Sequence, residues 1–449
     1  MYSFLKILVQ ISLRVYFRKV QVKGKENIED PGPYIFIANH PSAFMDPIVI
    51  ATSIKPAIYF LAAGEYMGKG FKYWFMNKFL HMIPVYRPET MPGETFKNDK
   101  VFDKCIEHLQ SGRTILVFPE GASNTEKKIS PLKTGVARIV RATEIASNME
   151  AHVKIVPIGL NYSNPHKFRS DLLVNIGEPI LAGNYFSLHQ ESEHEEVRAL
   201  TDHMEEQLIN TVLHVENHEL EELLDKINQT YSRDLKKKLG VGFENLNREF
   251  ELNKLTISAI NYFKEHDPEE YNSMTSAIDE YLTELEKYGA SDKEVRKVDE
   301  KTSFTERLFL IWGSIPFLIG FIGNILPYEL AILIQKKLDV KGSFRGSIIL
   351  AVGMFIFLVW YVGIMVTVWL TTPLSYFSLL IPPVLYFMGM HALVFSTAYQ
   401  YLTHRKRVRQ FLAKNPDVSN GLLEMRQLLM NRFERLRAKF DNRAEVNAS

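Results

Sequence analysis

Cysteine is almost absent from this sequence. Cys105 is the only one among 449 residues, which excludes a disulfide framework within the chain and a zinc site built from several cysteines. The simplest interpretation of Cys105 is a buried, unreactive thiol. The histidines and carboxylates do not form a recognised metal-binding motif, so we expect no metal site.

The N-terminus has no small-residue cleavage site of the kind that ends a classical signal peptide. Four basic residues also interrupt it too often for a comfortable membrane span, namely Lys6, Arg14, Arg18 and Lys19. Its apolar residues recur at three- and four-residue steps, which predicts an amphipathic helix over residues 1–20. Such a helix could lie in a membrane interface or pack on the core, and the sequence leaves both alternatives open.

Neither sign of charge dominates the chain, because the net charge is only +1. The charges are nevertheless segregated. Residues 191–300 read as an acidic helical region with a net charge of −15, so the remaining residues together carry +16. The basic ends suggest anionic partners such as phosphates or lipid headgroups.

Residues 21–190 have the pattern of an α/β domain, in which short apolar runs alternate with helical stretches. The expected strands are Tyr34–Ala38, Ala57–Leu61, Met82–Tyr86, Thr114–Phe118, Lys154–Ile158 and Leu172–Ile176. Helices are expected over Lys100–Leu109 and Gly135–Ala146. This alternation predicts a parallel or mixed sheet flanked by helices.

Long apolar runs are absent from the first 300 residues and fill much of a membrane region at 301–404. Residues 348–370 and 374–399 are each long enough to span a bilayer, and their basic flanks place both outer ends in the cytoplasm. Residues 308–334 contain several glycines, prolines and Asn324, so we expect a re-entrant or interfacial hairpin broken near Asn324–Pro327. Buried helices of a soluble protein are the alternative interpretation of all three.

The tail at 405–449 is basic, with a net charge of +6. Its apolar residues recur at three- and four-residue steps, which predicts an amphipathic helix. Such a helix suits either a membrane surface or a partner helix.

The stretch from Ala38 to Pro47 carries the strongest signal for chemistry. A loop after the first strand would present His40 at the carboxyl end of that strand, where open α/β sheets tend to bind ligands. His40 could accept a proton near neutral pH, and Asp46 could hold its other ring nitrogen. A continuous helix would separate the two side chains, so a turn is needed between them, and Pro41 can supply it.

Three further stretches lie at the ends of predicted strands or within one. Arg87 could grip a phosphate with two hydrogen bonds. Phe118, Pro119, Glu120 and Gly121 leave the next strand: Gly121 permits a tight turn, and Glu120 could orient a polyol hydroxyl or a cationic partner. A proline inside the strand Val156–Ile158 indicates an edge or a bulge.

In this order, the stretches resemble the four motifs of the glycerophospholipid acyltransferase superfamily, of 1-acylglycerol-3-phosphate type. These are the His–Asp motif (His40, Asp46), an Arg-bearing block (Arg87), a Phe-Pro-Glu-Gly block (Phe118–Gly121) and a Val-Pro block (Val156–Ile158). The usual motif has four residues between His and Asp, whereas five intervene here. That form looks more like the yeast-type glycerol-3-phosphate/dihydroxyacetone-phosphate acyltransferases and their bacterial relatives.

The resemblance implies a membrane-bound enzyme of phospholipid synthesis that moves a fatty acyl group from a thioester to a glycerol 3-phosphate hydroxyl. His40 and Asp46 would be catalytic. Arg87 and residues 118–121 would bind the acceptor. No cofactor or metal would be required, because acyl-CoA or acyl carrier protein brings the acyl group as a substrate. The implied partners are this donor, the glycerol phosphate and membrane lipid, with no nucleic acid, and the catalytic domain would face the cytoplasm.

Two other functions stay open at this point. The acceptor could instead be 1-acylglycerol 3-phosphate, the substrate of the second acylation. Alternatively, the chain could be a membrane lipid-binding scaffold without activity, although an intact His40 and Asp46 argue against this. A serine hydrolase is disfavoured because the chain has no Gly-x-Ser-x-Gly elbow.

Overall fold

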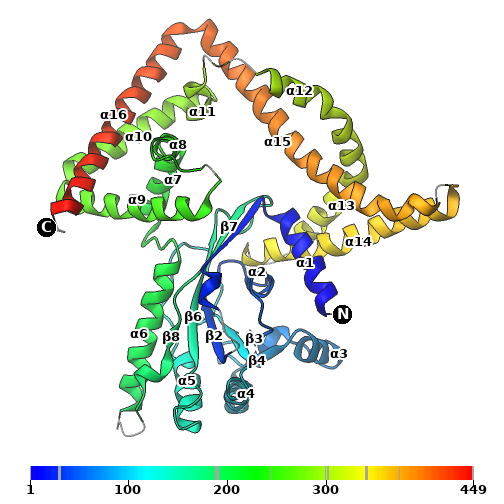
Figure 1. The fold of residues 1–449 in the computed structure, drawn as a ribbon. Coiled ribbons are helices and arrows are strands. Elements are labelled where there is room, and N and C mark those ends of the chain that lie inside the picture. The colour runs from blue at the N-terminus through cyan, green and yellow to red at the C-terminus, as the bar shows by residue number, and fades with distance from the viewer. Residues whose placement is uncertain are drawn as a thin grey trace. The chain divides into compact units, whose positions relative to one another are not determined.

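The computed structural model describes residues 2–28, 32–187, 192–242, 244–298, 300, 303–338, 342–373 and 375–446 (Figure 1). The chain forms two compact units. Unit 1 comprises Met1–His214 and Leu333–Met354, and unit 2 comprises Val215–Ile332 and Phe355–Ser449. Unit 1 is therefore discontinuous in sequence, and each unit is described by itself.

Unit 1 is built on an eight-stranded mixed sheet of order β1-β7-β6-β2-β5-β3-β4, with β8 paired to β6. The strands are β1 (Lys19–Lys23), β2 (Tyr34–Ala38), β3 (Ile58–Ala63), β4 (Met82–Val85), β5 (Thr114–Val117), β6 (Lys154–Tyr162), β7 (Asp171–Ile176) and β8 (Ile180–Leu181). Strands β6, β2, β5, β3 and β4 run parallel, whereas β7 is antiparallel to β6. The carboxyl ends of β2, β5, β3 and β4 consequently meet at one edge of the sheet, which we call the carboxyl edge.

The predicted mixed sheet flanked by helices is confirmed, and all six expected strands are present. Strand β1 was not expected, since the spacing of apolar residues predicted that the N-terminal helix extends to residue 20. The helix α1 ends at Tyr16 instead. Residues 19–23 alternate Lys or Gln with Val, and β1 pairs in parallel with β7 at the end of the sheet, where polar side chains can remain in water.

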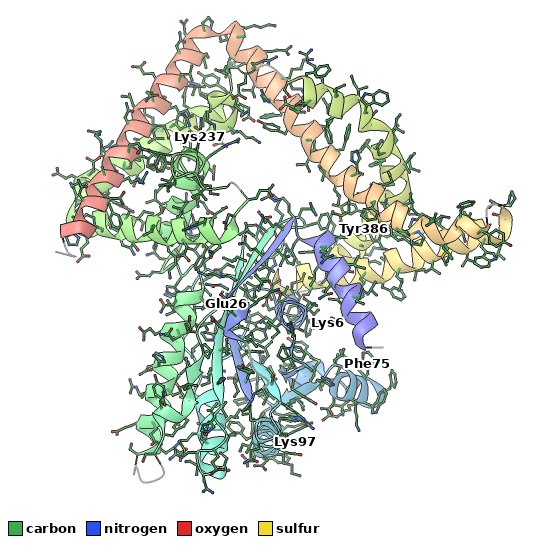
Figure 2. All side chains as sticks on the ribbon, in the orientation of Figure 1. Lys6, Glu26, Phe75, Lys97, Lys237 and Tyr386 are labelled. Atoms are coloured by element: carbon green, nitrogen blue, oxygen red, sulfur yellow. The ribbon has the colours of Figure 1, made fainter. Side chains whose placement is uncertain are left out.

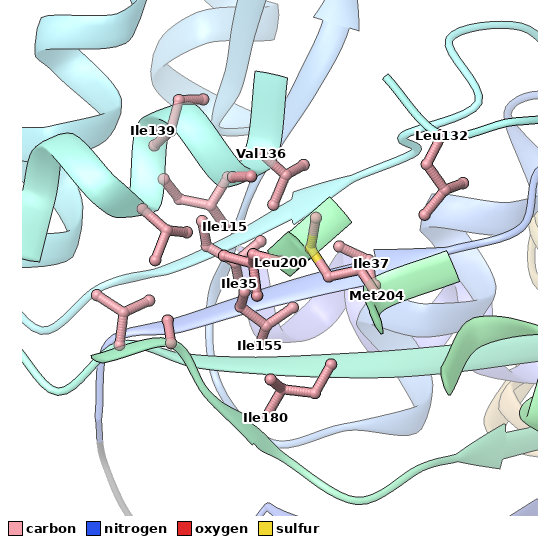
Figure 3. Close-up of a cluster of buried hydrophobic side chains, with 14 of the residues drawn as sticks. Ile35, Ile37, Ile115, Leu132, Val136, Ile139, Ile155, Ile180, Leu200 and Met204 are labelled. Atoms are coloured by element: carbon pink, nitrogen blue, oxygen red, sulfur yellow. The ribbon is translucent and has the colours of Figure 1, made fainter. Parts of the chain in front are cut away.

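Helices cover both faces of the sheet. Alternation along the strands sends Ile35 and Ile37 into a core covered by α4 (Asn98–Gln110), α5 (Gly135–Ala146) and α6 (Glu193–Thr211), seen in Figure 3. Tyr34 and Phe36 enter a second core under α1 (Tyr2–Tyr16) and α2 (Met45–Ser53). Burying one large apolar side chain stabilises such a fold by about 2 kcal/mol. Helix α6 thus belongs to unit 1, although it lies within the acidic stretch 191–300.

Cys105 and the N-terminal helix both contribute to the cores of unit 1. Cys105 is fully buried in the first core, and this burial raises the pKa of its thiol to about 12, as expected for an unreactive thiol. Helix α1 packs on the second core through Leu13 and Tyr16, while Ile7 and Ile11 remain exposed.

In unit 2, acidic helices are paired with the basic tail. Its helices before the apolar region are α7 (His218–Thr230), α8 (Ser232–Lys238), α9 (Leu246–His266), α10 (Pro268–Lys287) and α11 (Asp292–Arg296). The tail forms α16 (Pro416–Val446). Arg426 binds Asp292 and Asp234, and Arg432 binds Glu270. Of the two alternatives left open for the tail, the structure shows a helix that packs on partner helices.

The apolar region forms α12 (Phe304–Trp312), α13 (Ser314–Lys337), α14 (Arg345–Thr371) and α15 (Ile381–Lys414). Three apolar segments are long enough to cross a membrane, namely Ser314–Lys337, Gly342–Thr371 and Tyr376–Lys414, which indicates a membrane protein. Leu374, where the second span was expected to begin, lies outside the described residues.

The predicted break near Asn324–Pro327 is wrong, because α13 continues through both residues and the interruption falls at Gly313. The polar and small residues that suggested a break serve contacts between helices instead. Asn324 accepts a hydrogen bond from Tyr361 of α14 at 2.6 Å and donates one to the Leu385 carbonyl of α15 at 3.1 Å. At Gly320, an added Cβ would lie 2.0 Å from the Met388 carbonyl oxygen.

Candidate active site

A tight turn after β2 brings His40 and Asp46 together. The chain leaves β2 at Ala38, turns through Ala43, which has a φ of 41°, and enters α2 at Met45. This turn places Asp46 in the first turn of α2, with its Oδ2 atom 2.8 Å from Nδ1 of His40. The need for a turn between the two residues was foreseen from their spacing, and five intervening residues are compatible with direct contact.

The contact with a carboxylate determines which nitrogen of His40 can do chemistry. Because Asp46 accepts a hydrogen bond, the proton of a neutral His40 is assigned to Nδ1. Nε2 then remains free to accept a proton. The His40 side chain is 17% exposed, so a substrate can reach it, whereas that of Asp46 is fully buried.

Two further donors hold Asp46 in place. The backbone N–H of Ser42 donates to Oδ2 at 2.8 Å, and the Tyr162 hydroxyl donates to Oδ1 at 2.7 Å. Burial and the neighbouring carboxylate raise the pKa of Tyr162 well above its usual value, which keeps the hydroxyl protonated. Sequence reasoning missed Tyr162, and its one available signal was a polar side chain at the end of the strand that begins with the Val-Pro block.

The Phe-Pro-Glu-Gly residues lie directly beside the His–Asp pair. Phe118 stacks on the His40 imidazole, with ring centroids 3.9 Å apart and planes 16° apart. The two carboxylate oxygens of Glu120 accept hydrogen bonds from the backbone N–H groups of His40 and Ser130. Burial raises the pKa of Glu120. Glu120 therefore ties the His40 loop to the chain after β5, a contact that the sequence did not reveal.

Gly121 supplies the tight turn that was expected of it. Its φ of +79° lies in the left-handed region that favours glycine. An added Cβ would also meet the side chain of Lys133, whose Cε atom would lie 2.7 Å away. Lys133 is held there because its backbone N–H donates to the Pro119 carbonyl. A lysine side chain thus lies over the glycine at the carboxyl edge.

Arg87 follows β4 at the same edge of the sheet. Its side chain is partly buried and has no hydrogen bond or ion pair with the described residues. Strands in a sheet are about 4.8 Å apart, which puts β4 about 14 Å from β2. Arg87 is thus placed to hold a charged group at some distance from His40.

The proline of the Val-Pro block lies in an interior strand, at a local gap in the pairing. On one side of β6, β8 pairs up to Ile155 and β7 begins to pair at Ile158. Pro157 falls between these two partners, where a missing N–H costs no ladder hydrogen bond. Nearby, the side chain of Asn39 makes two hydrogen bonds with the backbone of Leu160 and so joins the end of β2 to β6.

No group of three or more His, Cys, Asp or Glu side chains within the described residues could hold a metal ion. At the carboxyl edge, the hydrogen-bonded pair of His40 and Asp46 can take up and release a proton.

Comparison with known families gives a match over this part of the chain. Residues 19–161 match the family model described as Acyltransferase. The chain carries an acyltransferase-family domain. The match begins at the first residue of β1 and ends one residue before Tyr162, so it includes all four motif blocks of the sequence analysis.

Several acyltransferases are similar to this chain. Glycerol-3-phosphate O-acyltransferase 1 of Saccharomyces cerevisiae is 22% identical over 400 residues, which cover 70% of this chain and 51% of that protein. Glycerol-3-phosphate O-acyltransferase 2 of the same yeast is 34% identical over 109 residues, covering 24% and 14%. The 1-acyl-sn-glycerol-3-phosphate acyltransferase of Borreliella burgdorferi is 25% identical over 169 residues, covering 38% and 61%.

The chain thus spans about half or less of the length of the two yeast relatives. Among solved structures, the 1-acyl-sn-glycerophosphate (LPA) acyltransferase of Thermotoga maritima is similar, with a TM-score of 0.33 and 23% identity. That similarity covers 46% of this chain and 77% of the Thermotoga chain.

Proposed function

We propose that this protein is a membrane-bound O-acyltransferase that moves a fatty acyl group from a thioester to a hydroxyl of glycerol 3-phosphate. The observation that carries the proposal is the His40–Asp46 hydrogen bond of 2.8 Å, which leaves Nε2 free at the carboxyl edge of the sheet. The names of the two yeast relatives favour glycerol 3-phosphate as acceptor.

In the proposed reaction, Nε2 of His40 takes the proton of the acceptor hydroxyl as its oxygen attacks the thioester carbonyl. The tetrahedral intermediate collapses, the carbon–sulfur bond breaks, and the departing thiolate takes the proton from His40. Asp46 keeps the imidazole oriented and stabilises its protonated form. No acyl-enzyme and no cofactor are needed, and the acyl group arrives on acyl-CoA or acyl carrier protein.

The other site residues receive roles that fit their positions. Arg87 follows β4, two strands from β5 in the sheet, and would hold the acceptor phosphate. Gly121 and the overlying Lys133 would line the path from this phosphate to His40. Phe118 and Pro119 would shape the pocket beside the imidazole. Glu120 would act through the backbone, by fixing the His40 loop. The apolar helices would anchor the protein, with the catalytic domain on the cytoplasmic side.

The second candidate is acylation of 1-acylglycerol 3-phosphate, which the name of the Borreliella relative favours. Both reactions use the same chemistry and differ only in the acceptor. A lipid-binding scaffold without activity is the third candidate.

A radiolabelled acyl-transfer assay on membranes that contain the full chain separates these functions. Wild type and His40→Ala are offered each acceptor, with acyl-CoA or acyl carrier protein as donor. We expect His40-dependent product from glycerol 3-phosphate. Product from the lysolipid alone would assign the second acylation. Equal product from wild type and His40→Ala would contradict the mechanism, and no transfer under any combination would favour the scaffold.

A further inference from the structure

Exposed apolar side chains on the α/β part of unit 1 gather at one edge. Among the side chains that the structure describes between residues 34 and 186, the large hydrophobic ones that are exposed are Phe44, Tyr66, Phe71, Tyr73, Trp74, Phe96 and Leu181. All but Leu181 lie on segments that leave the carboxyl ends of β2, β3 and β4. Phe44 belongs to the loop that carries His40, and its ring contacts that of Tyr66, with centroids 5.7 Å apart. Exposed apolar side chains so unevenly distributed indicate an interaction surface.

The segment between β3 and β4, residues 64–81, is the most apolar of these surfaces. In α3 (Phe71–Trp74), Phe71 is 77% exposed and Trp74 is 52% exposed, and their rings stack with centroids 5.6 Å apart. The place of these rings can be found in Figure 2 from the label of Phe75, the residue that follows Trp74. Two large aromatic rings side by side in water are unfavourable unless another apolar phase covers them.

The same segment is basic. Lys69, Lys72 and Lys78 are interleaved with the aromatic residues, and Glu65 is the one acidic residue in 64–81. Aromatic rings next to lysines are typical of protein segments that lie at the headgroup level of a bilayer. Lysines close to a membrane surface also favour anionic lipid, by about 1 kcal/mol each.

A third observation ties these segments to a candidate membrane span. The short helix η6 (Gly342–Phe344) leads into α14, and both belong to the apolar segment Gly342–Thr371. Phe344 packs within unit 1 against Phe44 and Tyr66, with ring centroids 5.4 and 5.9 Å apart. The first residues of a helix long enough to cross a bilayer therefore touch the loop that carries His40 and the start of segment 64–81.

We propose that the first part of this segment, residues 66–75 around α3, lies in the interfacial layer of a bilayer that contains anionic phospholipid. Phe71 and Trp74 insert beneath the headgroups, and the lysines remain at the phosphates. The benefit of this arrangement rests on the proposed function. A donor with a fatty chain would reach His40, and the acylated product would leave it, without crossing water. The three structural observations stand without that function.

Fluorescence quenching by lipids tests the insertion directly in the full chain. Because Cys105 is the sole cysteine, Cys105→Ala gives a background in which one introduced cysteine can be labelled. Tyr73→Cys labelled with an environment-sensitive dye reports on the segment and leaves Phe71 and Trp74 in place. Leu181→Cys is the matched control, because Leu181 is 50% exposed but pairs with Lys154 at the opposite edge of the sheet.

The labelled proteins are reconstituted in phosphatidylcholine vesicles, with or without phosphatidylglycerol, that contain doxyl-labelled lipid. We expect quenching at position 73 to exceed that at 181 several-fold, and to increase with phosphatidylglycerol. Adding Phe71→Ser and Trp74→Ser should reduce it to the level at 181. Equal quenching at both positions would overturn the proposal. Quenching at position 73 that is the same with and without phosphatidylglycerol would overturn the preference for anionic phospholipid. The readout needs no turnover, so failure of the proposed function would leave this result unaffected.

Discussion

The Tyr162 hydroxyl occupies an acceptor site on Asp46 that would otherwise be unsatisfied in a buried setting. A hydrogen bond to a charged group contributes about 1.5–3 kcal/mol. Since Tyr162 acts only through Asp46, we expect Tyr162→Phe to lower kcat about tenfold, near the lower end of that range, with KM unchanged.

Steady-state kinetics measures both parameters. Tyr34→Phe is the matched control, because Tyr34 is equally buried in the same sheet and makes no contact with Asp46. An unchanged kcat in Tyr162→Phe, or an equal loss in both variants, would show that the hydroxyl does not position Asp46.

A second group of titratable residues, of which His108 is buried, lies at the opposite edge of the sheet. Tyr59 stacks between His81 and His108, with ring centroids 4.7 and 4.2 Å apart, and the Arg113 guanidinium donates to Nδ1 of His108 at 2.7 Å. Burial, followed by the charge of Arg113, lowers the pKa of both histidines. The neutral imidazole is thus the form that the folded protein favours.

The stability that His108 contributes is fully present above its unfolded pKa of about 6.5. This contribution is lost as the pH falls through the lower folded-state pKa. We expect the unfolding temperature to fall between about pH 6.5 and pH 5, and to fall less steeply in His108→Gln. Thermal denaturation across pH measures this slope. The same slope in His108→Gln would assign the acid sensitivity to other groups.

At the scale of elements, the contact between α13 and α15 depends on a residue without a side chain. Gly320→Ala gains up to about 1 kcal/mol in helix propensity, but its Cβ would collide with the Met388 carbonyl oxygen. The backbone shift this requires costs about 1–3 kcal/mol, so we expect a net loss of stability. Gly363→Ala on α14 meets nothing within 4 Å and should be neutral or stabilising. Thermal denaturation in detergent compares the two, and a stabilised Gly320→Ala would contradict the packing.

The elements that sequence predicted best are those set by local pattern. Strands β2 and β5 are apolar runs bounded by turn residues, and they were located to within one residue. The course of α13 was predicted wrongly because Gly320, Asn324 and Pro327 weaken an isolated helix. Here Asn324 makes hydrogen bonds to α14 and α15, and Gly320 packs closely on the Met388 carbonyl, contacts that an isolated helix lacks.

Contacts between distant residues account for what could not be predicted at the site. The spacing of His40 and Asp46 was sufficient to suggest that they meet, because they share one turn. Tyr162 lies 116 residues from Asp46, and only the pairing of β6 with β2 brings them together. Glu120 is likewise visible as a motif residue, but its backbone partners depend on how the loop folds.

At the scale of the whole molecule, the near-zero net charge conceals internal pairing between an acidic middle and a basic tail. Within unit 2, Arg426 of α16 donates to Asp292 at 2.7 Å, and the Tyr281 hydroxyl donates to the same carboxylate. Asp292 is only 4% exposed. Burial raises its pKa, and Arg426 opposes that shift.

Removing Arg426 would take away the cation that donates to the buried Asp292 carboxylate and leave it to Arg296, whose guanidinium lies 3.9 Å away. We expect Arg426→Leu to destabilise the protein by about 3 kcal/mol. Arg435→Leu on the same helix is the control, since the exposed Arg435 has no ion pair in the part of the chain that the structure describes. Denaturant unfolding and protease sensitivity of α16 measure the difference. Equal stability of the two variants would show that the ion pairs are incidental.

Unit 1 is assembled from two stretches of sequence, and their separation imposes an order in time. The ribosome makes the 118 residues Val215–Ile332 between them, which takes about 6–24 s at 5–20 residues per second. During this interval the loop that carries His40 lacks Phe344, and the second core lacks Leu350. A newly made chain thus completes the loop that carries His40 only after α13 has been synthesised, so the final packing of this loop waits for the apolar segments to emerge.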